Sequence, residues 1–145
     1  MTEEVTKKQP VSLKSLLTPS KTVEFDFPGK ENFKVKLTYL AREELLKLRS
    51  RCVSQKFNKK TRQYEEDFDT DKFLPEYIKA VIQGWSGLKY SYLEEFLLVD
   101  VSSFNPDDCL EFSLENAETL MKNSGDFDQW VTDTVGDLEN FTGRK

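Results

Sequence analysis

The sequence predicts an α+β protein, mostly helical, in which an N-terminal β-hairpin packs on a bundle of about four to five helices. Residues 22–39 alternate apolar and polar side chains with the period of two that half-buried strands require. Much of the remaining chain repeats its apolar side chains at helical spacing. A length of 145 residues with 37% hydrophobic content is enough to enclose one core but hardly two. We therefore expect a flexible arm at residues 1–20, one domain at 21–141 and a tail at 142–145.

The expected arm is polar and holds two prolines. Its apolar side chains form only a short patch, made of Val11, Leu13, Leu16 and Leu17. Such a segment buries too little surface to offset the entropy lost on ordering. We expect residues 5–17 to be disordered in the free protein, with the patch docking on the core or on a partner.

The hairpin is expected from strands at residues 22–27 and 33–39. Pro28 and Gly29 favour a turn between them, because proline fixes φ and glycine permits a positive φ. The polar face then brings acidic side chains opposite basic ones in pairs worth about 0.2–1 kcal/mol each. These side chains are Glu24, Asp26, Lys34 and Lys36. Helices must cover the apolar face, because an isolated hairpin is only marginally stable in water.

Two helices are expected in the middle of the chain, at residues 41–57 and 71–85. The polar residues 58–70 between them show no periodicity and indicate a solvated connection. Thr70 is the expected N-cap of the second helix, whose wide apolar face is typical of a central helix. Two glycines bracket its expected end, Gly84 and Gly87.

The C-terminal third is expected to hold several shorter helices. Residues 90–101 fit either a short helix or a lead into a strand at 97–101, and we favour the helix. Asn105 followed by Pro106 is typical of a helix start. Ser113 is expected to cap a helix that runs to residue 123, and a turn at 124–126 leads into a last helix ending at 141. The apolar stripe of that helix is Phe127, Trp130, Val131, Val135, Leu138 and Phe141.

Residues that could perform catalysis are scarce. The chain has no histidine, which excludes every Ser–His or Cys–His mechanism. Ser86 lies between glycines, but their spacing does not match a nucleophile elbow. Catalysis by carboxylates alone remains open in principle, although the acidic residues of 107–118 fit solvated helix faces and helix first turns. We expect a protein that is not an enzyme and that needs no cofactor.

Metal binding is also not expected. Asp67, Asp69 and Asp71 resemble the start of a calcium loop, but the sixth and twelfth positions are Lys72 and Ile78 where that loop needs glycine and glutamate. The two cysteines match no metal spacing, and we expect both Cys52 and Cys109 to be small buried hydrophobic residues.

Charge is distributed unevenly along the chain. Residues 1–75 hold 16 Lys and Arg against 12 Asp and Glu, whereas residues 76–145 hold 5 against 14. No concentrated basic face is expected, which argues against a general nucleic-acid binder. Opposite charge at two ends permits head-to-tail self-association or docking on oppositely charged partners. No segment has the length and apolar character of a membrane span or a signal peptide, so we expect a soluble intracellular protein.

Four segments follow one another in a specific order along the chain. They are the hairpin, the junction at 37–45, Trp85-Ser86-Gly87-Leu88, and the helix start at 112–117 that contains Asn116. Each segment is common alone, but in this order, over about residues 23–141, they resemble the tail assembly chaperones of long-tailed bacteriophages. The charged residues 58–70 form a long insert relative to that pattern.

The resemblance implies a small, largely helical protein that binds the tape measure protein, keeps it soluble and helps the tail tube protein polymerise around it. It also implies action in the host cell cytoplasm, absence from the mature virion, and in many members a longer form made by frameshifting. Two other functions remain open: a minor structural virion protein such as a tail-completion or neck subunit, and a small phage adaptor or inhibitor that binds a host protein.

A protein that holds an apolar client needs an apolar groove with a charged rim. The last helix offers such a stripe among many acidic residues. The resemblance also matches four positions that recur in the family, Trp85, Gly87, Leu88 and Asn116. The expected partner-binding residues are Phe127, Trp130, Val131, Leu138, Phe141, Trp85 and Leu88. The alternative is that the same stripe only closes the core.

Overall fold

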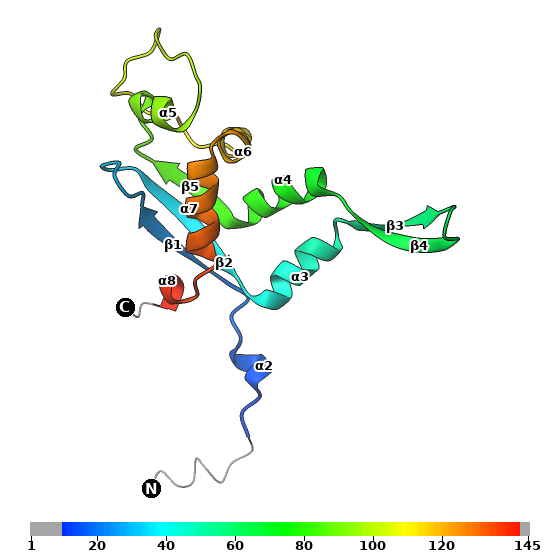
Figure 1. The fold of residues 1–145 in the computed structure, drawn as a ribbon. Helices are drawn as coiled ribbons and strands as arrows, with labels where there is room; N and C mark the ends of the chain where they lie inside the picture. Colours follow the sequence, from blue (N-terminus) through cyan, green and yellow to red (C-terminus); the bar gives the residue numbers. More distant parts are fainter. Residues whose placement is uncertain (1–9, 143–145) are drawn as a thin grey trace, which may run out of the picture.

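The computed structural model describes residues 10–142 and has mixed α+β structure, as the sequence predicts. Figure 1 shows a three-stranded sheet covered by helices, from which two helices and a second, two-stranded sheet project. The helices are α2 (Leu13–Leu16), α3 (Arg42–Ser50), α4 (Thr70–Val81), α5 (Tyr90–Phe96), α6 (Leu114–Asn123), α7 (Gly125–Val135) and α8 (Glu139–Thr142). The strands are β1 (Ser20–Asp26), β2 (Lys34–Leu40), β3 (Val53–Asn58), β4 (Gln63–Phe68) and β5 (Ile82–Ser86).

The three-stranded sheet is antiparallel, with β2 between β1 and β5. The register places Asp26 opposite Lys34, whose Nζ lies 2.7 Å from an Asp26 carboxylate oxygen. The turn between β1 and β2 has Gly29 at a φ of 80°, the positive value that the Pro28–Gly29 pair predicts. The alternating pattern thus places the polar pair at the surface and the apolar side chains against the helices.

The core lies between the apolar face of the sheet and helices α4 to α8. Phe33, Val35 and Leu37 from β2 and its approach are fully buried. They pack with buried side chains of α4, α6 and α7, among them Ile78 and Leu120. The central position of β2 explains this burial, because strands flank it on both edges and helices cover its apolar face.

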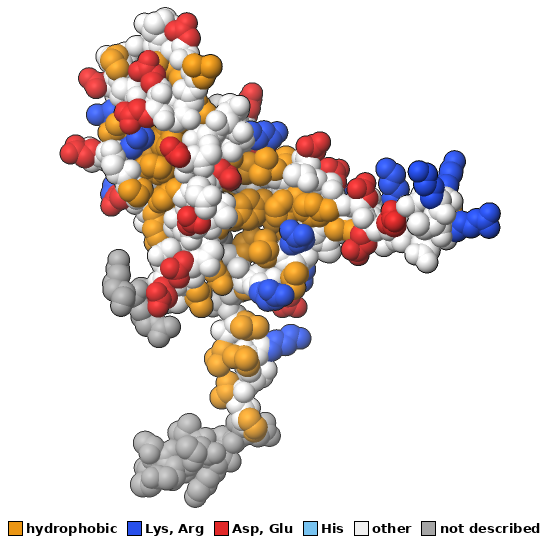
Figure 2. Space-filling model, viewed as in Figure 1, with side chains coloured by type: hydrophobic (Ala, Val, Ile, Leu, Met, Phe, Trp, Pro, Cys, Tyr) orange, Lys and Arg blue, Asp and Glu red, His pale blue; other side chains and the backbone are white. Residues whose placement is uncertain are grey.

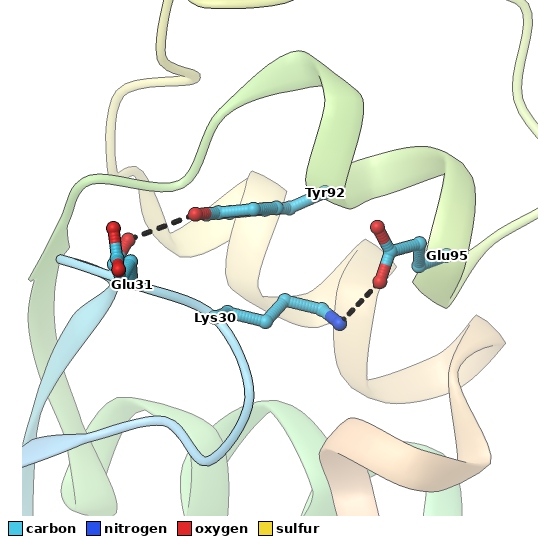
Figure 3. A network of polar contacts seen from close by, with 4 residues as sticks. All are labelled: Lys30, Glu31, Tyr92 and Glu95. Carbon is cyan, nitrogen blue, oxygen red and sulfur yellow. Dashed lines mark hydrogen bonds and ion pairs between the residues drawn. The ribbon is translucent and has the colours of Figure 1, made fainter.

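The turn between β1 and β2 is fastened to α5 by a small polar network (Figure 3). The Nζ of Lys30 lies 2.7 Å from a carboxylate oxygen of Glu95 and 5.0 Å from the ring centroid of Phe96. The Tyr92 hydroxyl donates a hydrogen bond of 2.9 Å to the Glu31 backbone carbonyl. Two side chains of α5 therefore hold the turn in place.

The helix expected at 71–85 ends earlier, and that prediction was wrong at both ends. Its N-cap is Asp69 in place of Thr70, because the Asp69 carboxylate accepts a hydrogen bond from the Lys72 backbone N–H. It ends at Val81, and the next five residues form β5 against the free edge of β2. Ile82 and Trp85 suit a strand at least as well as a helix, and the open edge of β2 supplies their hydrogen-bonding partners.

The helix expected at 41–57 and the connection expected at 58–70 were also wrong. α3 ends at Ser50, and the following residues form the hairpin of β3 and β4. Its loop closes because the Asn58 side-chain oxygen accepts hydrogen bonds from the backbone N–H groups of Lys60 and Thr61, and because Arg62 adopts a φ of 58°. An Asx turn therefore orders a segment whose composition suggested a loop.

The C-terminal predictions had mixed outcomes. The short helix favoured within 90–101 is α5, and Ser113 caps α6 as predicted. The helix start expected at Asn105 is wrong, because residues 105–108 form a single turn. The backbone carbonyls of Pro106 and Asp108 accept hydrogen bonds from the first residues of α5, so they cannot propagate a helix.

The last helix is interrupted, although the sequence predicts one helix to residue 141. α7 ends at Val135 with Gly136 as its C-cap, and α8 begins after Asp137, whose carboxylate accepts a hydrogen bond from the Glu139 backbone N–H. Glycine is a poor helix former and aspartate a good cap, so the break occurs between them. The break turns Phe141 back onto β1 and β2, where its ring contacts Phe25 and Tyr39.

Candidate functional site

Most of the predicted partner-binding residues belong to the core. Phe127, Val131, Leu88 and Phe141 are buried, and Trp85 and Trp130 are half-buried. Leu138 differs, because it lies after the break at Gly136 and is 51% exposed. This packing fits the alternative in which most of the stripe closes the core.

Phe127, on α7, is the centre of an aromatic cluster that joins α7 to the sheet and to α5. Its ring centroid lies 5.8 Å from that of Phe96, 6.3 Å from that of Phe33 and 6.4 Å from that of Trp85. Aromatic pairs at these separations add about 0.5–1.5 kcal/mol each beyond the area they bury. The position predicted to contact a partner is therefore a packing centre.

The two tryptophans also contact other side chains and backbone groups inside the protein. The Trp85 indole N–H donates a 3.0 Å hydrogen bond to the Leu110 carbonyl, and its ring meets Phe112 edge-on at 5.0 Å. The ring centroid of Trp130 lies 4.7 Å from that of Phe27. Each indole thus connects a helix or strand to a neighbouring segment.

Among residues 10–142, exposed apolar side chains are grouped in three places, and Leu46, Leu114 and Leu138 are exposed singly. The first is the arm patch, formed by Val11, Leu13, Leu16 and Leu17, which the sequence had indicated. Leu13 is 71% exposed, and none of the residues of α2 is buried. Figure 2 shows this patch as a row of hydrophobic side chains on the segment that extends away from the sheet.

The second exposed place is the tip of the β3–β4 hairpin, residues 57–64, which we call the hairpin tip. Phe57 and Tyr64 lie opposite each other across the two strands, with ring centroids 5.2 Å apart, and both are exposed. The loop adds Lys59, Lys60 and Arg62, and the tip holds no acidic residue. Figure 2 shows the basic side chains grouped at the far end of the projection. The signal available in the sequence was the aromatic pair on either side of an Asn-initiated turn.

The third exposed place is the segment after α5, where Leu98, Val99 and Phe104 face solvent. With Leu97 and residues of α6, Leu98 and Val99 line a cavity of about 320 Å³. The ring of Phe104 stacks on Tyr90 with centroids 4.6 Å apart, so one of its faces is already covered.

A cavity of about 350 Å³ lies beside α8, and we call it the α8 cavity. Its apolar lining is Tyr39, Leu138 and Phe141, and Lys21 contributes one cation. Asp137 and Glu139 are exposed on either side of Leu138 in the sequence. The cavity itself is lined by these three apolar side chains, Lys21 and three hydroxyl-bearing residues, Thr18, Ser20 and Thr142.

Tyr77 is a half-buried titratable group of α4 that faces Asp128 and Thr132 of α7. Burial raises the pKa of the Tyr77 phenol above its ordinary value of 10.0, and the Asp128 carboxylate raises it further, while a hydrogen bond with the Thr132 side chain acts in the opposite direction. A cavity of about 220 Å³ lies beside Tyr77, lined also by Leu40, Leu45 and Val135. The neutral phenol is the form that this site favours.

No cluster of three or more metal-binding side chains occurs within residues 10–142. The three aspartates that resemble a calcium loop are separated, with Asp67 on β4, Asp69 capping α4 and Asp71 within α4. Cys52 is buried, as expected, but the same expectation was wrong for Cys109, which is exposed. Ser86 ends β5 and has no neighbouring histidine, because the chain contains none.

No protein-family model, curated protein or solved structure matches this chain. Across residues 10–142, none of the helices combines the length and apolar character needed to cross a bilayer.

Proposed function

We propose that this chain is a tail assembly chaperone of long-tailed bacteriophages, which binds the tape measure protein, keeps it soluble and promotes polymerisation of tail tube subunits around it. The proposal includes action in the host cell cytoplasm and absence from the mature virion. It is supported by the resemblance of residues 23–141 to that family and by the exposed apolar surface described above.

The observation that carries the proposal is the arm patch. Four aliphatic side chains, Val11, Leu13, Leu16 and Leu17, are exposed within seven residues, and none of them belongs to the core cluster. Leaving such side chains in water forgoes about 1.5–3 kcal/mol for each one that a partner would bury. A long apolar helix, such as a tape measure protein presents, is a client that this patch fits.

This assignment moves the client contact from α7 to the arm. The α7 stripe holds the sheet and helices together, so a client could reach it only if the core opened. The arm is accessible without any change in the core. Leu17 also lines a cavity of about 420 Å³ with Pro19 and Ala41, which extends the patch to the start of α3.

The test is co-expression with the tape measure protein of the same phage, followed by size-exclusion chromatography with light scattering. We expect a soluble complex with the unchanged chain and loss of that complex with Leu13→Ser/Leu16→Ser. The matched control is Leu98→Ser/Phe104→Ser, which removes exposed apolar side chains from another surface and should keep the complex.

The two other functions give different outcomes. A minor virion subunit would be present in purified particles and would not solubilise the tape measure protein. A host-directed adaptor would co-purify with a host protein when the chain is expressed in cells that lack all other phage genes. Either result, together with an insoluble tape measure protein, contradicts the chaperone proposal.

A further inference from the structure

We infer that the hairpin tip is a binding site for single-stranded nucleic acid, which it contacts through two exposed aromatic rings and three cationic side chains. The inference goes beyond the proposed function, because it concerns a different surface and requires no tape measure protein. The acidic balance of the whole chain argues against a general nucleic-acid binder, so the inference is limited to this one projection.

The hairpin is held at its base and uncovered at its tip. Figure 1 shows it extending away from the three-stranded sheet, and among the described elements β3 and β4 have extensive contact only with each other. At the base, the Arg49 guanidinium lies 4.7 Å from the ring centroid of Phe68, and Asp69 donates its backbone N–H to the Cys52 carbonyl at 2.8 Å. Such a projection presents its side chains to a ligand at low entropic cost.

Positive charge is concentrated toward the tip. Residues 45–64 contain seven Lys and Arg and no Asp or Glu. Two of these seven, on and just after α3, pair with carboxylates. At the tip, Lys59, Lys60 and Arg62 are exposed and form no ion pair with any residue in the described range. Three unpaired cations on one loop favour an anionic ligand.

The hairpin separates this charge from most of the acidic residues that follow it in the sequence. Side chains alternate between the two faces of a strand, and cross-strand partners share a face. Glu65 and Asp67 therefore lie on the face opposite to Tyr64, where Glu65 accepts a 3.1 Å hydrogen bond from the Asn58 side-chain amide. Only Glu66 shares the face of the aromatic pair, and it lies nearer to the base. The fold thus leaves the tip basic, although acidic residues follow it directly in the sequence.

The aromatic pair identifies the kind of anion. Phe57 and Tyr64 are both exposed, and their rings meet edge to face at an interplanar angle of 65°. An edge-to-face pair leaves at least one face of each ring open. Nucleic-acid bases stack on such faces whatever their sequence, while cations beside the rings contact the phosphates. An acidic peptide would pair with the cations but leave the ring faces unused, so the combination favours a single strand.

An ordered loop holds the cations next to the rings. The Arg62 backbone N–H donates a 2.7 Å hydrogen bond to the Asn58 carbonyl, and the Asn58 side-chain oxygen accepts two more from the backbone N–H groups of Lys60 and Thr61. A strand that stacks on the rings therefore meets cations that start from fixed backbone positions. The site matches a short stretch of strand, about two stacked bases and the phosphates beside them.

The test is fluorescence anisotropy of a labelled oligothymidylate of about 12 nucleotides, titrated with the full chain at a series of salt concentrations. We expect a dissociation constant of about 10⁻⁴–10⁻⁶ M, the range of sequence-independent contacts. Its logarithm should rise with the logarithm of salt concentration at a slope of about 2, since three phosphate contacts contribute about 0.7 each on a single strand. Oligouridylate of the same length shows whether DNA or RNA binds more tightly, and binding of either supports the inference.

One pair of variants tests the charge. Lys59→Gln/Lys60→Gln should weaken binding by about tenfold or more and lower the salt slope to about 0.7, because one cation remains. The matched control Lys72→Gln/Lys79→Gln makes the same change in net charge on α4 and should bind like the unchanged chain.

A second pair of variants tests the rings. Phe57→Leu/Tyr64→Leu should weaken binding by about tenfold but leave the salt slope unchanged, because it removes stacking and no charge. Tyr64→Phe keeps the ring and should bind like the unchanged chain. Circular dichroism should show that all the variants are folded.

Four results would overturn the inference. The first is an unchanged chain that binds neither oligonucleotide at low salt, and the second is binding that the tip variants leave intact. The third is polyglutamate that displaces the labelled strand as well as unlabelled oligothymidylate does, which would assign the tip to acidic peptides. The fourth is tighter binding of a duplex of the same length, which would indicate insertion of the two-stranded ribbon into a groove.

Discussion

Gly87 determines how the chain leaves β5 beneath the turn between β1 and β2. Its φ is 76°, and a Cβ at this position would overlap the backbone carbonyl oxygen of Asn32. The sequence had placed this glycine at the end of a helix. In the structure it instead allows its backbone to pass close to the backbone of Asn32.

We predict that Gly87→Ala destabilises the protein by about 3 kcal/mol or more, because it combines a positive φ with a backbone clash. Gly29→Ala is the matched control, since Gly29 has a φ of 80° but open space around it, and it should cost only about 1–2 kcal/mol. Urea unfolding followed by circular dichroism measures both. Equal losses would mean that the contact with Asn32 carries no cost.

Lys30 contributes through its charge and through the rings around it. Its side chain is only 12% exposed, whereas that of Glu95 is 60% exposed. We predict that Lys30→Met lowers the free energy of unfolding by about 1–2 kcal/mol, because both the ion pair and the cation–π contacts are lost. Glu95→Gln should cost about 0.5 kcal/mol, since it removes the ion pair alone. Similar losses in the two variants, measured by urea unfolding, would contradict a role for the rings.

At the scale of elements, α7 and α8 illustrate how one helical stripe is divided between core and surface. We predict that Phe127→Ala costs about 3–5 kcal/mol, because it removes the centre of the aromatic cluster. Leu138→Ala should change stability by no more than about 0.5 kcal/mol, because the side chain is exposed. Trp130→Ala should be intermediate between them. Thermal and urea unfolding measure the loss of stability in the three variants. A large loss in Leu138→Ala would contradict the exposed position of this side chain.

The β3–β4 hairpin contributes no residue to the core cluster. We predict that replacing residues 57–64 with Asn-Gly, which joins Lys56 to its cross-strand partner Glu65 by a two-residue turn, leaves the free energy of unfolding within about 1 kcal/mol. Cooperative unfolding in urea would confirm an intact core. Loss of the cooperative transition would instead show that the core requires the hairpin in order to fold.

At the scale of the whole molecule, stability is coupled to pH through Tyr77, which lies between α4 and α7. Because the pKa of Tyr77 is raised in the folded state, the unfolded chain loses this proton first as the pH rises. The contribution of Tyr77 is fully present below a pH of about 10, the ordinary value for tyrosine, and is lost as the pH rises through the folded-state pKa.

We therefore predict that the free energy of unfolding falls at alkaline pH and that Tyr77→Phe makes this fall shallower. Asp128→Asn should have a smaller effect in the same direction, because it removes the second cause of the shift. Urea unfolding at a series of pH values from about 8 to 11 provides the measurement. An unchanged pH dependence in Tyr77→Phe would show that other groups control alkaline unfolding.

Local patterns in the sequence were sufficient for several elements. Alternation over residues 22–39 predicted β1 and β2 with their apolar face, and the Pro28–Gly29 pair predicted the turn. Ser113 predicted the start of α6, because a cap depends only on residues within one helical turn. The arm patch was also visible, since a cluster of aliphatic residues in a polar segment needs no fold to be noticed.

Other features depended on what the folded chain places side by side. Residues 82–86 became a strand because β2 had a free edge, and residues 53–68 became a hairpin through pairing of Phe57 with Tyr64 across the turn. Most of the predicted binding stripe is buried or half-buried because the sheet and α5 lie against it, whereas Leu138 is exposed. A periodic pattern shows that a face will be covered but does not show by what.

The sequence by itself determined the α+β class, the apolar faces, the turn and cap residues, and the opposite charge of the two halves, since each follows from short-range chemistry or composition. Only the tertiary structure decided that Phe127 is core and Leu138 is surface, that Gly87 serves a backbone contact, and that the hairpin tip and the α8 cavity lie at opposite ends. These outcomes depend on contacts between residues far apart in the chain, and no local pattern specifies such contacts.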